Sequence, residues 1–89
     1  PITEYLLQQN YPNPFNTLTT IKYQVAFQSN VSLKLYDILG REVSILVYEQ
    51  KPAGRYEARF TNDNLASGIY LYRIESGSFI KTKKMILLK

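Results

Sequence analysis

The most regular feature of the chain is an alternation of apolar and polar residues with a period of two. Ile21, Tyr23 and Val25 fall on one face of an extended chain, while the lysine and the glutamine between them fall on the other. Residues 31–38 and 55–60 alternate in the same way. Since successive side chains of a β-strand point to opposite faces, this pattern predicts strands with one buried face and one face in water.

Two segments are instead apolar on both faces. Residues 43–48 read VSILVY and residues 69–74 read IYLYRI. Such runs suit strands that are covered on both sides, or strand faces that meet a neighbouring domain. A buried helix is the competing interpretation, but the β-branched and aromatic residues favour strands.

Turn-forming residues separate these segments. Two prolines in residues 11–16 exclude a central strand there, because proline cannot donate to a β-ladder. This loop is expected to close one end of the domain with Phe15, and a recognition surface is the alternative. Asp37 and Gly40 fit a type I turn in which the carboxylate accepts backbone N–H bonds and the glycine takes a positive φ. Structural turn roles are assigned to Pro12, Pro14, Asp37, Gly40, Gly54 and Gly68.

The pattern as a whole predicts seven strands and an all-β fold. The strands span residues 4–8, 19–27, 31–37, 42–48, 55–61, 68–75 and 79–88. Seven short antiparallel strands are typical of an immunoglobulin-like β-sandwich, and a small barrel is the alternative. The length corresponds to a single domain over residues 1–89. From the absence of an initiator methionine and of a signal peptide, we expect a fragment of a larger secreted protein.

The composition argues against an enzyme. The chain has no cysteine and no histidine, which removes thiolate zinc sites, the commonest general base and the commonest transition-metal ligand. There is no phosphate-binding glycine loop, and Asp63 has no acidic neighbour in its loop. We therefore predict a non-catalytic domain without a metal or another cofactor. No apolar run is long enough for insertion into a membrane.

The net charge lies entirely at the carboxyl end. The formal charge is +4; residues 79–89 hold four lysines and no acid, and elsewhere seven Lys and Arg balance seven Asp and Glu. Lysines that protect an edge strand from aggregation would explain Lys81 and Lys83, but not the apolar residues 85–88. Because the body is neutral, nucleic-acid binding is not predicted. An exposed terminal strand could also pair two copies into a homodimer.

Six ordered pieces of the chain resemble one family. They are NYPNPFN at 10–16, TIKY at 20–23, LKLYDILGREV at 33–43, AGRY at 53–56, ASGIYLYR at 66–73 and KKMILLK at 83–89. Together they resemble the type A C-terminal sorting domain of the type IX (Por) secretion system of Bacteroidetes. Related sequences often place Trp-Asp-Gly where this chain has FTNDN at 60–64. The immunoglobulin-like module of flagellar hook-capping proteins has a similar pattern, but the KKMILLK ending favours the sorting domain.

This resemblance implies a function in protein export. The domain would be the last module of a cargo protein that has reached the periplasm, and it would direct the cargo through the outer-membrane translocon to the cell surface or the medium. Shuttle and sortase components are further implied partners, and a sortase cut would fall around or upstream of residues 1–4. The residues predicted for recognition by the export machinery are Lys83, Lys84, Met85, Ile86, Leu87, Leu88 and Lys89.

A second hypothesis is an accessory immunoglobulin-like domain of a secreted enzyme that binds carbohydrate or protein. In that case Tyr23, Tyr56, Tyr70 and Tyr72 would supply an aromatic platform for sugars. Their alternate spacing favours the core of a sandwich instead.

Overall fold

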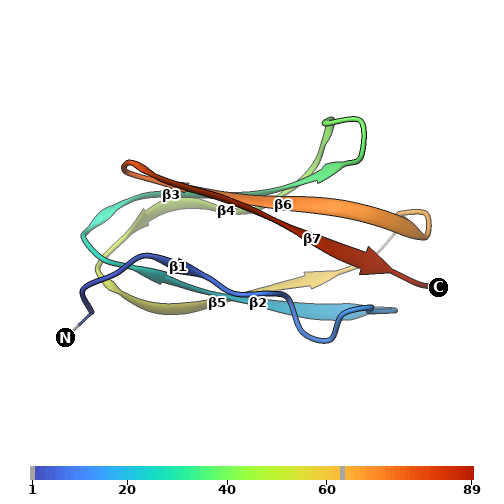
Figure 1. Ribbon diagram of the computed structural model, residues 1–89, viewed down its shortest axis with the longest axis horizontal. Coiled ribbons are helices and arrows are strands. Elements are labelled where there is room, and N and C mark those ends of the chain that lie inside the picture. Colours follow the sequence, from blue (N-terminus) through green and yellow to red (C-terminus); the bar gives the residue numbers. More distant parts are fainter. Residues whose placement is uncertain (1, 63) are drawn as a thin grey trace.

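Seven strands in two antiparallel sheets make up the computed structural model, which describes residues 2–62 and 64–89 (Figure 1). The predicted all-β class and the predicted number of strands are confirmed, and the described residues contain no helix. The strands are β1 (Leu6–Leu7), β2 (Leu18–Val25), β3 (Ser29–Asp37), β4 (Glu42–Lys51), β5 (Gly54–Thr61), β6 (Gly68–Ser76) and β7 (Phe79–Leu87).

The two sheets pack face to face as a sandwich. One sheet has the order β1-β2-β5 and the other has the order β4-β3-β6-β7. In constant-type immunoglobulin domains the fourth strand lies beside the fifth. Here β4 pairs with β3 instead, since a tight turn joins the two strands and keeps them adjacent.

The turn between β3 and β4 has the predicted chemistry. The Asp37 carboxylate accepts the N–H of Leu39 at 2.9 Å and the N–H of Arg41 at 3.0 Å. Gly40 donates its N–H to the Asp37 carbonyl at 3.0 Å and takes a φ of 85°, which a side chain would strain. The backbone and side-chain bonds from Arg41 hold the pKa of the Asp37 carboxyl below its usual range.

The core lies between the sheets and contains the inward residues of the alternating strands. In β2 and β3 every second residue is buried, as the period of two predicts. Tyr23, Tyr70 and Tyr72 are among the buried residues, and Tyr56 is half-buried with its ring stacked on Tyr23 at 5.5 Å. The tyrosines therefore belong to the sandwich core rather than to an exposed aromatic platform.

The strands that are apolar on both faces have a different environment from the one expected. β4 has no fully buried residue, and Ile45 and Tyr48 are exposed. Ile69 is 44% exposed on β6. The expectation of cover on both faces is thus wrong within this chain. The edge position of β4 and two register irregularities in its pairing with β3 account for its exposure.

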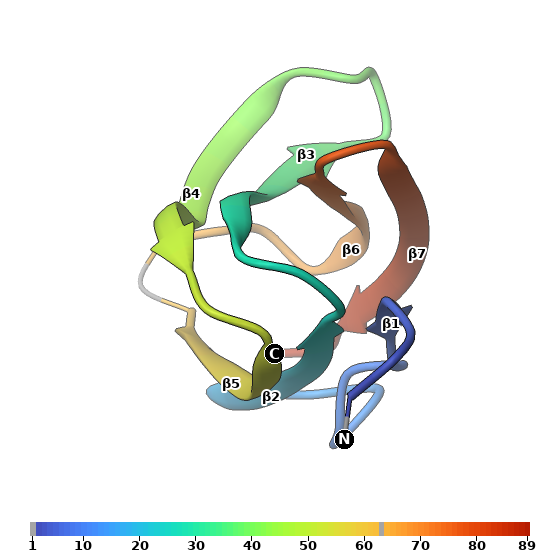
Figure 2. The same cartoon turned by 90° about the vertical axis from the view of Figure 1, so that its left-hand side faces the viewer.

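The first strand is shorter than predicted, and the segment that follows it contacts both sheets. Leu6 and Leu7 pair with β2, and the Gln8 N–H still reaches the Lys22 carbonyl. Farther along, Tyr11 still forms an antiparallel bridge with Thr20 of β2, and Phe15 then forms a parallel bridge with Leu87 of the other sheet. Figure 2 shows this segment crossing beneath the edge of β7. A predicted strand of five residues is therefore reduced to two.

The remaining predicted turn residues lie in connections or at strand starts. Pro12 and Pro14 are exposed in the loop between β1 and β2, which ends on the buried Phe15. Gly54 begins β5 and Gly68 begins β6. A Cβ at Gly54 would lie 3.3 Å from the Tyr56 hydroxyl, so a larger residue there would require a small shift of the Tyr56 side chain. Asp63 lies outside the described residues.

Candidate functional site

The candidate site is the terminal segment, residues 79–89, whose first nine residues form β7 at one edge of the four-stranded sheet. β7 pairs along its full length with β6, from Phe79 opposite Ser76 to Leu87 opposite Gly68. Its other edge has no strand of the sheet beside it. We refer to residues 79–83 as the proximal half of the terminal segment and to residues 84–89 as the distal half.

The residues predicted for recognition separate into buried and accessible groups. Met85 and Leu87 are fully buried in the core, and Ile86 is half-buried on the opposite face. Leu88 is 55% exposed, and Lys84 and Lys89 are exposed as well. Lys83 is half-buried. A partner that binds the folded domain can therefore contact the lysines and Leu88 but not Met85 or Leu87.

The outer edge of the distal half is occupied by residues 9–15, which we call the clasp. Phe15 donates its N–H to the Ile86 carbonyl at 2.9 Å and accepts the N–H of Leu88 at 2.9 Å. These two bonds form a short parallel ladder. The buried Phe15 ring packs edge-on against Phe60 at 6.1 Å, which fixes the clasp to the core.

Two side chains of the clasp complete this cover. Asn13 Oδ1 accepts the N–H of Ile86 at 2.9 Å. Gln9 Nε2 donates to the Lys84 carbonyl at 2.6 Å. At the end of the chain, Lys89 donates its N–H to Ser67 Oγ at 3.0 Å. The backbone of the distal half is therefore held by the domain itself over most of its length.

A buried tyrosine anchors the start of the clasp. The Tyr72 hydroxyl donates to the Gln8 carbonyl at 2.7 Å and accepts the Asn10 N–H at 2.9 Å. Asn10 is also buried, and its side chain donates to Thr19 Oγ1 at 2.9 Å and to the Pro12 carbonyl at 3.2 Å. Burial raises the pKa of Tyr72 to about 12, against a smaller opposing effect of the Asn10 N–H.

Sequence reasoning did not identify this network. Nothing in the alternation of apolar and polar residues distinguishes Tyr72 from the other inward tyrosines, because a hydroxyl partner 62 to 64 positions away has no local signal. No prediction from the sequence concerns Gln9, and Asn10 enters only as the first residue of the NYPNPFN piece at 10–16. A polar residue such as Asn10 in a segment that must close the core is the one sequence feature that could have drawn attention to it.

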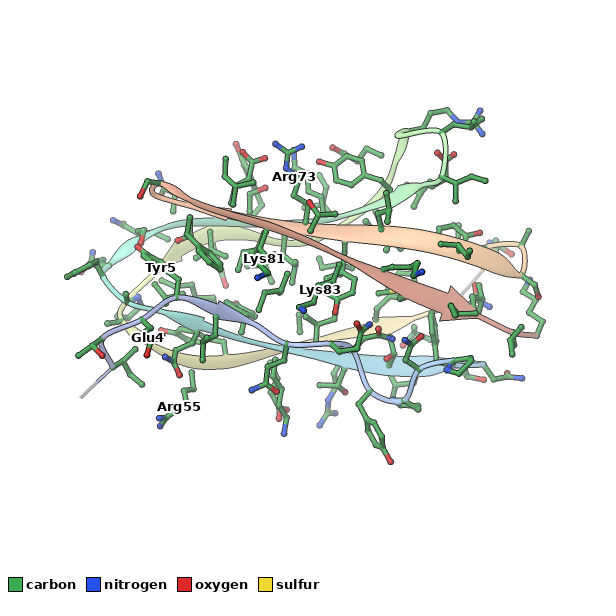
Figure 3. All side chains as sticks on the ribbon, in the orientation of Figure 1. Glu4, Tyr5, Arg55, Arg73, Lys81 and Lys83 are labelled. Atoms are coloured by element: carbon green, nitrogen blue, oxygen red, sulfur yellow. The ribbon has the colours of Figure 1, made fainter. Side chains whose placement is uncertain are left out.

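The proximal half is open in comparison. Bonded and free backbone groups alternate along an edge strand, so Ile80 and Thr82 direct theirs to the same edge as Ile86. Among the described residues none pairs with them. Lys81 and Lys83 point from β7 toward β1, into the region where the edges of the two sheets diverge (Figure 3). Tyr5 stacks on Phe79 at 5.2 Å and closes the far end of this region.

No described carboxylate forms an ion pair with the lysines of the terminal segment. Five ion pairs join described residues, and all of them involve basic residues of other strands or turns. The ammonium groups of Lys81, Lys83, Lys84 and Lys89 form none of them. The positive charge that the sequence concentrates at the carboxyl end is thus not neutralised by a described carboxylate.

No candidate metal site is found in the described part of the chain. No group of three or more acidic, histidine or cysteine side chains gathers there in a way that could hold a metal ion. No helix of the described residues has the length and apolar character needed to cross a membrane. The terminal segment offers a charged, partly apolar surface that a binding partner can contact.

Comparison with known proteins gives one family match. The family described as "Secretion system C-terminal sorting domain" matches residues 9–88. No curated protein matches the sequence. Among solved structures, CopC from Methylosinus trichosporium OB3b is similar with 17% identity and a TM-score of 0.49, over 94% of this chain and 91% of that one.

Proposed function

The chain belongs to the secretion system C-terminal sorting domain family, and from this membership we propose how it serves as a sorting signal for type IX secretion. The family is non-catalytic and implies interaction with the secretion machinery and export across the outer membrane to the surface. We propose that the domain, as a single unit over residues 1–89, follows a cargo protein through the periplasm and is read there by the translocon and its shuttle.

The main support for this proposal is the positive charge of the terminal segment, which no described carboxylate neutralises. Four lysines and no acid lie in residues 79–89, and none of these lysines is paired with a described carboxylate. Opposite charge on a partner would speed the encounter and select among surfaces. Lys84, Leu88 and Lys89 are exposed at the distal end. In this proposal they are the side chains that the machinery reads on the folded domain.

Met85 and Leu87 act differently from the residues around them. Both are fully buried, so their part in recognition would be to hold the distal half in place. Removal of the last residues would therefore combine loss of recognition with loss of core packing. A test of recognition has to change the exposed side chains alone.

Removal of the domain by a surface sortase is a further part of the proposal. The segment before β1 is the reasonable place for a cut, because Thr3 and Glu4 are exposed and lie outside any strand. Pro1, at the start of the predicted region, lies outside the described residues. Cleavage there would leave the cargo at the cell surface or in the medium.

The proposal is tested by export of a reporter. The 89-residue chain is fused to the carboxyl end of a periplasmic fluorescent protein in a bacterium with an intact type IX system, and fluorescence outside the outer membrane is measured. We expect export with the wild-type domain and a loss of about tenfold for the variant that combines Lys84→Glu, Leu88→Ser and Lys89→Glu. Export at the wild-type level by that variant would exclude recognition through these side chains.

A matched control separates charge from position. Lys22→Glu with Arg59→Glu reverses two basic residues on the exposed face of the three-stranded sheet. We expect this variant to be exported normally. Equal loss of export in both variants would show that net charge alone matters. Export of the reporter without any domain would contradict the sorting function itself.

A further inference from the structure

The proximal half of the terminal segment is an unfilled strand position. From its open backbone and its lysines, we infer that it accepts an extended segment of another protein that carries acidic side chains at alternate positions. This inference rests on the proposed function, since it names the chemistry of a partner for the same terminal segment. It concerns residues that the proposed recognition of the distal end does not need.

The first support is the main chain of β7. Ile80 and Thr82 direct their backbone groups to the outer edge, where no described residue pairs with them. An edge of this kind binds an added strand through main-chain hydrogen bonds. The domain itself demonstrates this on the same edge, because Phe15 of the clasp adds to Ile86 and Leu88 by two such bonds. The clasp fills only the distal half.

The second support is the shape of the region beside this edge. The edges of the two sheets lie close together at the distal end and diverge toward the start of β7 (Figures 1 and 2). β1 pairs with β2 over only two residues and has no ladder with β7. An added strand would therefore extend the four-stranded sheet into the region between β7 and β1.

The third support is charge. Lys81 and Lys83 lie two residues apart, so both point to one side of the strand and toward β1 (Figure 3). Neither forms an ion pair with a described carboxylate. Acidic side chains at alternate positions of an added strand would lie opposite them. The chemistry of the partner follows from this spacing.

The same lysines disfavour a second copy of this chain as the occupant. Antiparallel pairing of two proximal halves about Lys81 would bring the two Lys81 side chains together across the ladder. Like charges directly opposite one another are destabilising. The homodimer through the terminal strand, expected above as an alternative, is therefore less favourable here than a complex with an acidic strand.

The inference is tested with the 89-residue chain and a synthetic peptide. The probe is a capped peptide of six residues in which valine alternates with glutamate, added to the isotope-labelled chain at low salt. We expect amide shifts centred on residues 80–84 and weaker binding as salt is added. A peptide with lysine in place of glutamate should not bind. Absence of binding by the acidic peptide, or shifts centred on another face, would overturn the inference.

Two protein variants identify the cause of binding. Lys81→Glu with Lys83→Glu should lower the affinity for the acidic peptide by about tenfold, because two exposed ion pairs become repulsive. The same variant should bind the lysine peptide. Lys22→Glu with Arg59→Glu, which makes the same change of charge elsewhere, should bind the acidic peptide as the wild type does. Equal weakening in both variants would exclude a local site.

The main-chain contribution has its own variant. Thr82→Pro removes one outward donor from the edge and leaves the bonds to β6 in place, since proline is tolerated at such edge positions. We expect the Thr82→Pro variant to bind the acidic peptide more weakly than the wild type does. A peptide N-methylated at the positions that face β7 gives the same information with the wild-type chain, should the proline variant not fold. Undiminished binding of the methylated peptide would exclude strand addition.

The reporter assay separates this inference from the sorting function. If the acidic peptide does not bind the wild-type chain while the distal-end variant loses export, the inference fails alone and the sorting function stands. If export needs no part of the domain, the proposed function fails, and peptide binding still decides the inference. A dimer of the free chain in sedimentation experiments, broken by the lysine reversal or by Thr82→Pro, would assign the edge to self-association and overturn the inference.

Discussion

The two halves of the terminal segment differ although they belong to one strand and one basic sequence. The distal half is pinned to the core by Met85 and Leu87, and its outer edge is covered by the clasp. In the proximal half Ile80, Lys81 and Thr82 have exposed side chains, and no described residue covers the outer edge. Position along a strand therefore does not define accessibility, because cover comes from segments that are distant in sequence.

This difference suggests that the two halves of the terminal segment make different kinds of contact. A half whose backbone is already hydrogen-bonded can be read only through its exposed side chains, whereas a half with a free edge can also be read through its backbone. The former suits a fixed sorting signal that persists in the folded domain. The proximal half, with its free edge, suits a transient contact that dissociates when the partner changes.

The largest expected effect comes from comparing one buried and one exposed residue. Met85→Ala should lower the free energy of unfolding by about 2–5 kcal/mol, because it leaves a cavity in the core between the sheets. Lys81→Ser should change it by less than about 0.5 kcal/mol, since the side chain is exposed and unpaired. Urea unfolding of both variants measures the contrast. Equal effects would mean that the two halves are not energetically distinct.

An intermediate effect concerns alkaline pH and the tyrosine that anchors the clasp. The pKa of Tyr72 is raised to about 12 in the folded domain, against about 10 for an exposed tyrosine. The folded state therefore holds this proton more tightly than the unfolded state. The contribution of the protonated Tyr72 hydroxyl to the free energy of unfolding is complete below about pH 10. It falls by about 3 kcal/mol as the pH rises to about 12.

The control for this pH dependence is Tyr72→Phe. The variant should be less stable by about 1–3 kcal/mol at neutral pH, because the buried Asn10 N–H loses its acceptor. It should also show a smaller decline between about pH 10 and 12 than the wild type. Parallel pH curves for the two proteins would show that the decline has another origin, such as the deprotonation of lysines.

The smallest expected effect tests the clasp at a single side chain. Asn13→Ala removes the acceptor of the Ile86 N–H and should lower the free energy of unfolding by about 0.5–1.5 kcal/mol. Hydrogen exchange gives the sharper readout. In the wild type the Ile86 and Leu88 amides should exchange more slowly than the Thr82 amide, and the variant should speed exchange at Ile86 first. Fast exchange at Ile86 in the wild type would contradict a closed clasp.

Much of the fold could be predicted from the sequence. The alternation in β2 and β3 determined which side chains face the core, because strand geometry leaves only two faces to choose between. The turn at Asp37 and Gly40 was recognisable for the same reason: its bonds run between residues at most four positions apart. All seven strands came within three residues of their observed ends.

The errors came from contacts that no local pattern records. The first strand was predicted over residues 4–8, but only Leu6 and Leu7 form a ladder with β2, and the segment after them bridges to β2 again at Tyr11 and to the other sheet at Phe15. Residues 43–48 were expected to be covered on both sides or to meet a neighbouring domain, and within this chain the edge position and irregular register of β4 leave it exposed. In both cases the pairing and burial of the strand depend on which sheet edges lie beside it. The position of those edges is set only when the two sheets have packed together.

The sequence alone determined the strands, the main turn and the position of the positive charge, because these depend on the period of side chains along an extended chain and on the count of ionisable residues. Only the tertiary structure decided which part of the basic end is accessible. The clasp bonds to Lys84 and Ile86 span 75 and 73 positions. Hydrogen bonds over such separations depend on how the two sheets meet, and that arrangement is set by the packing of the whole core.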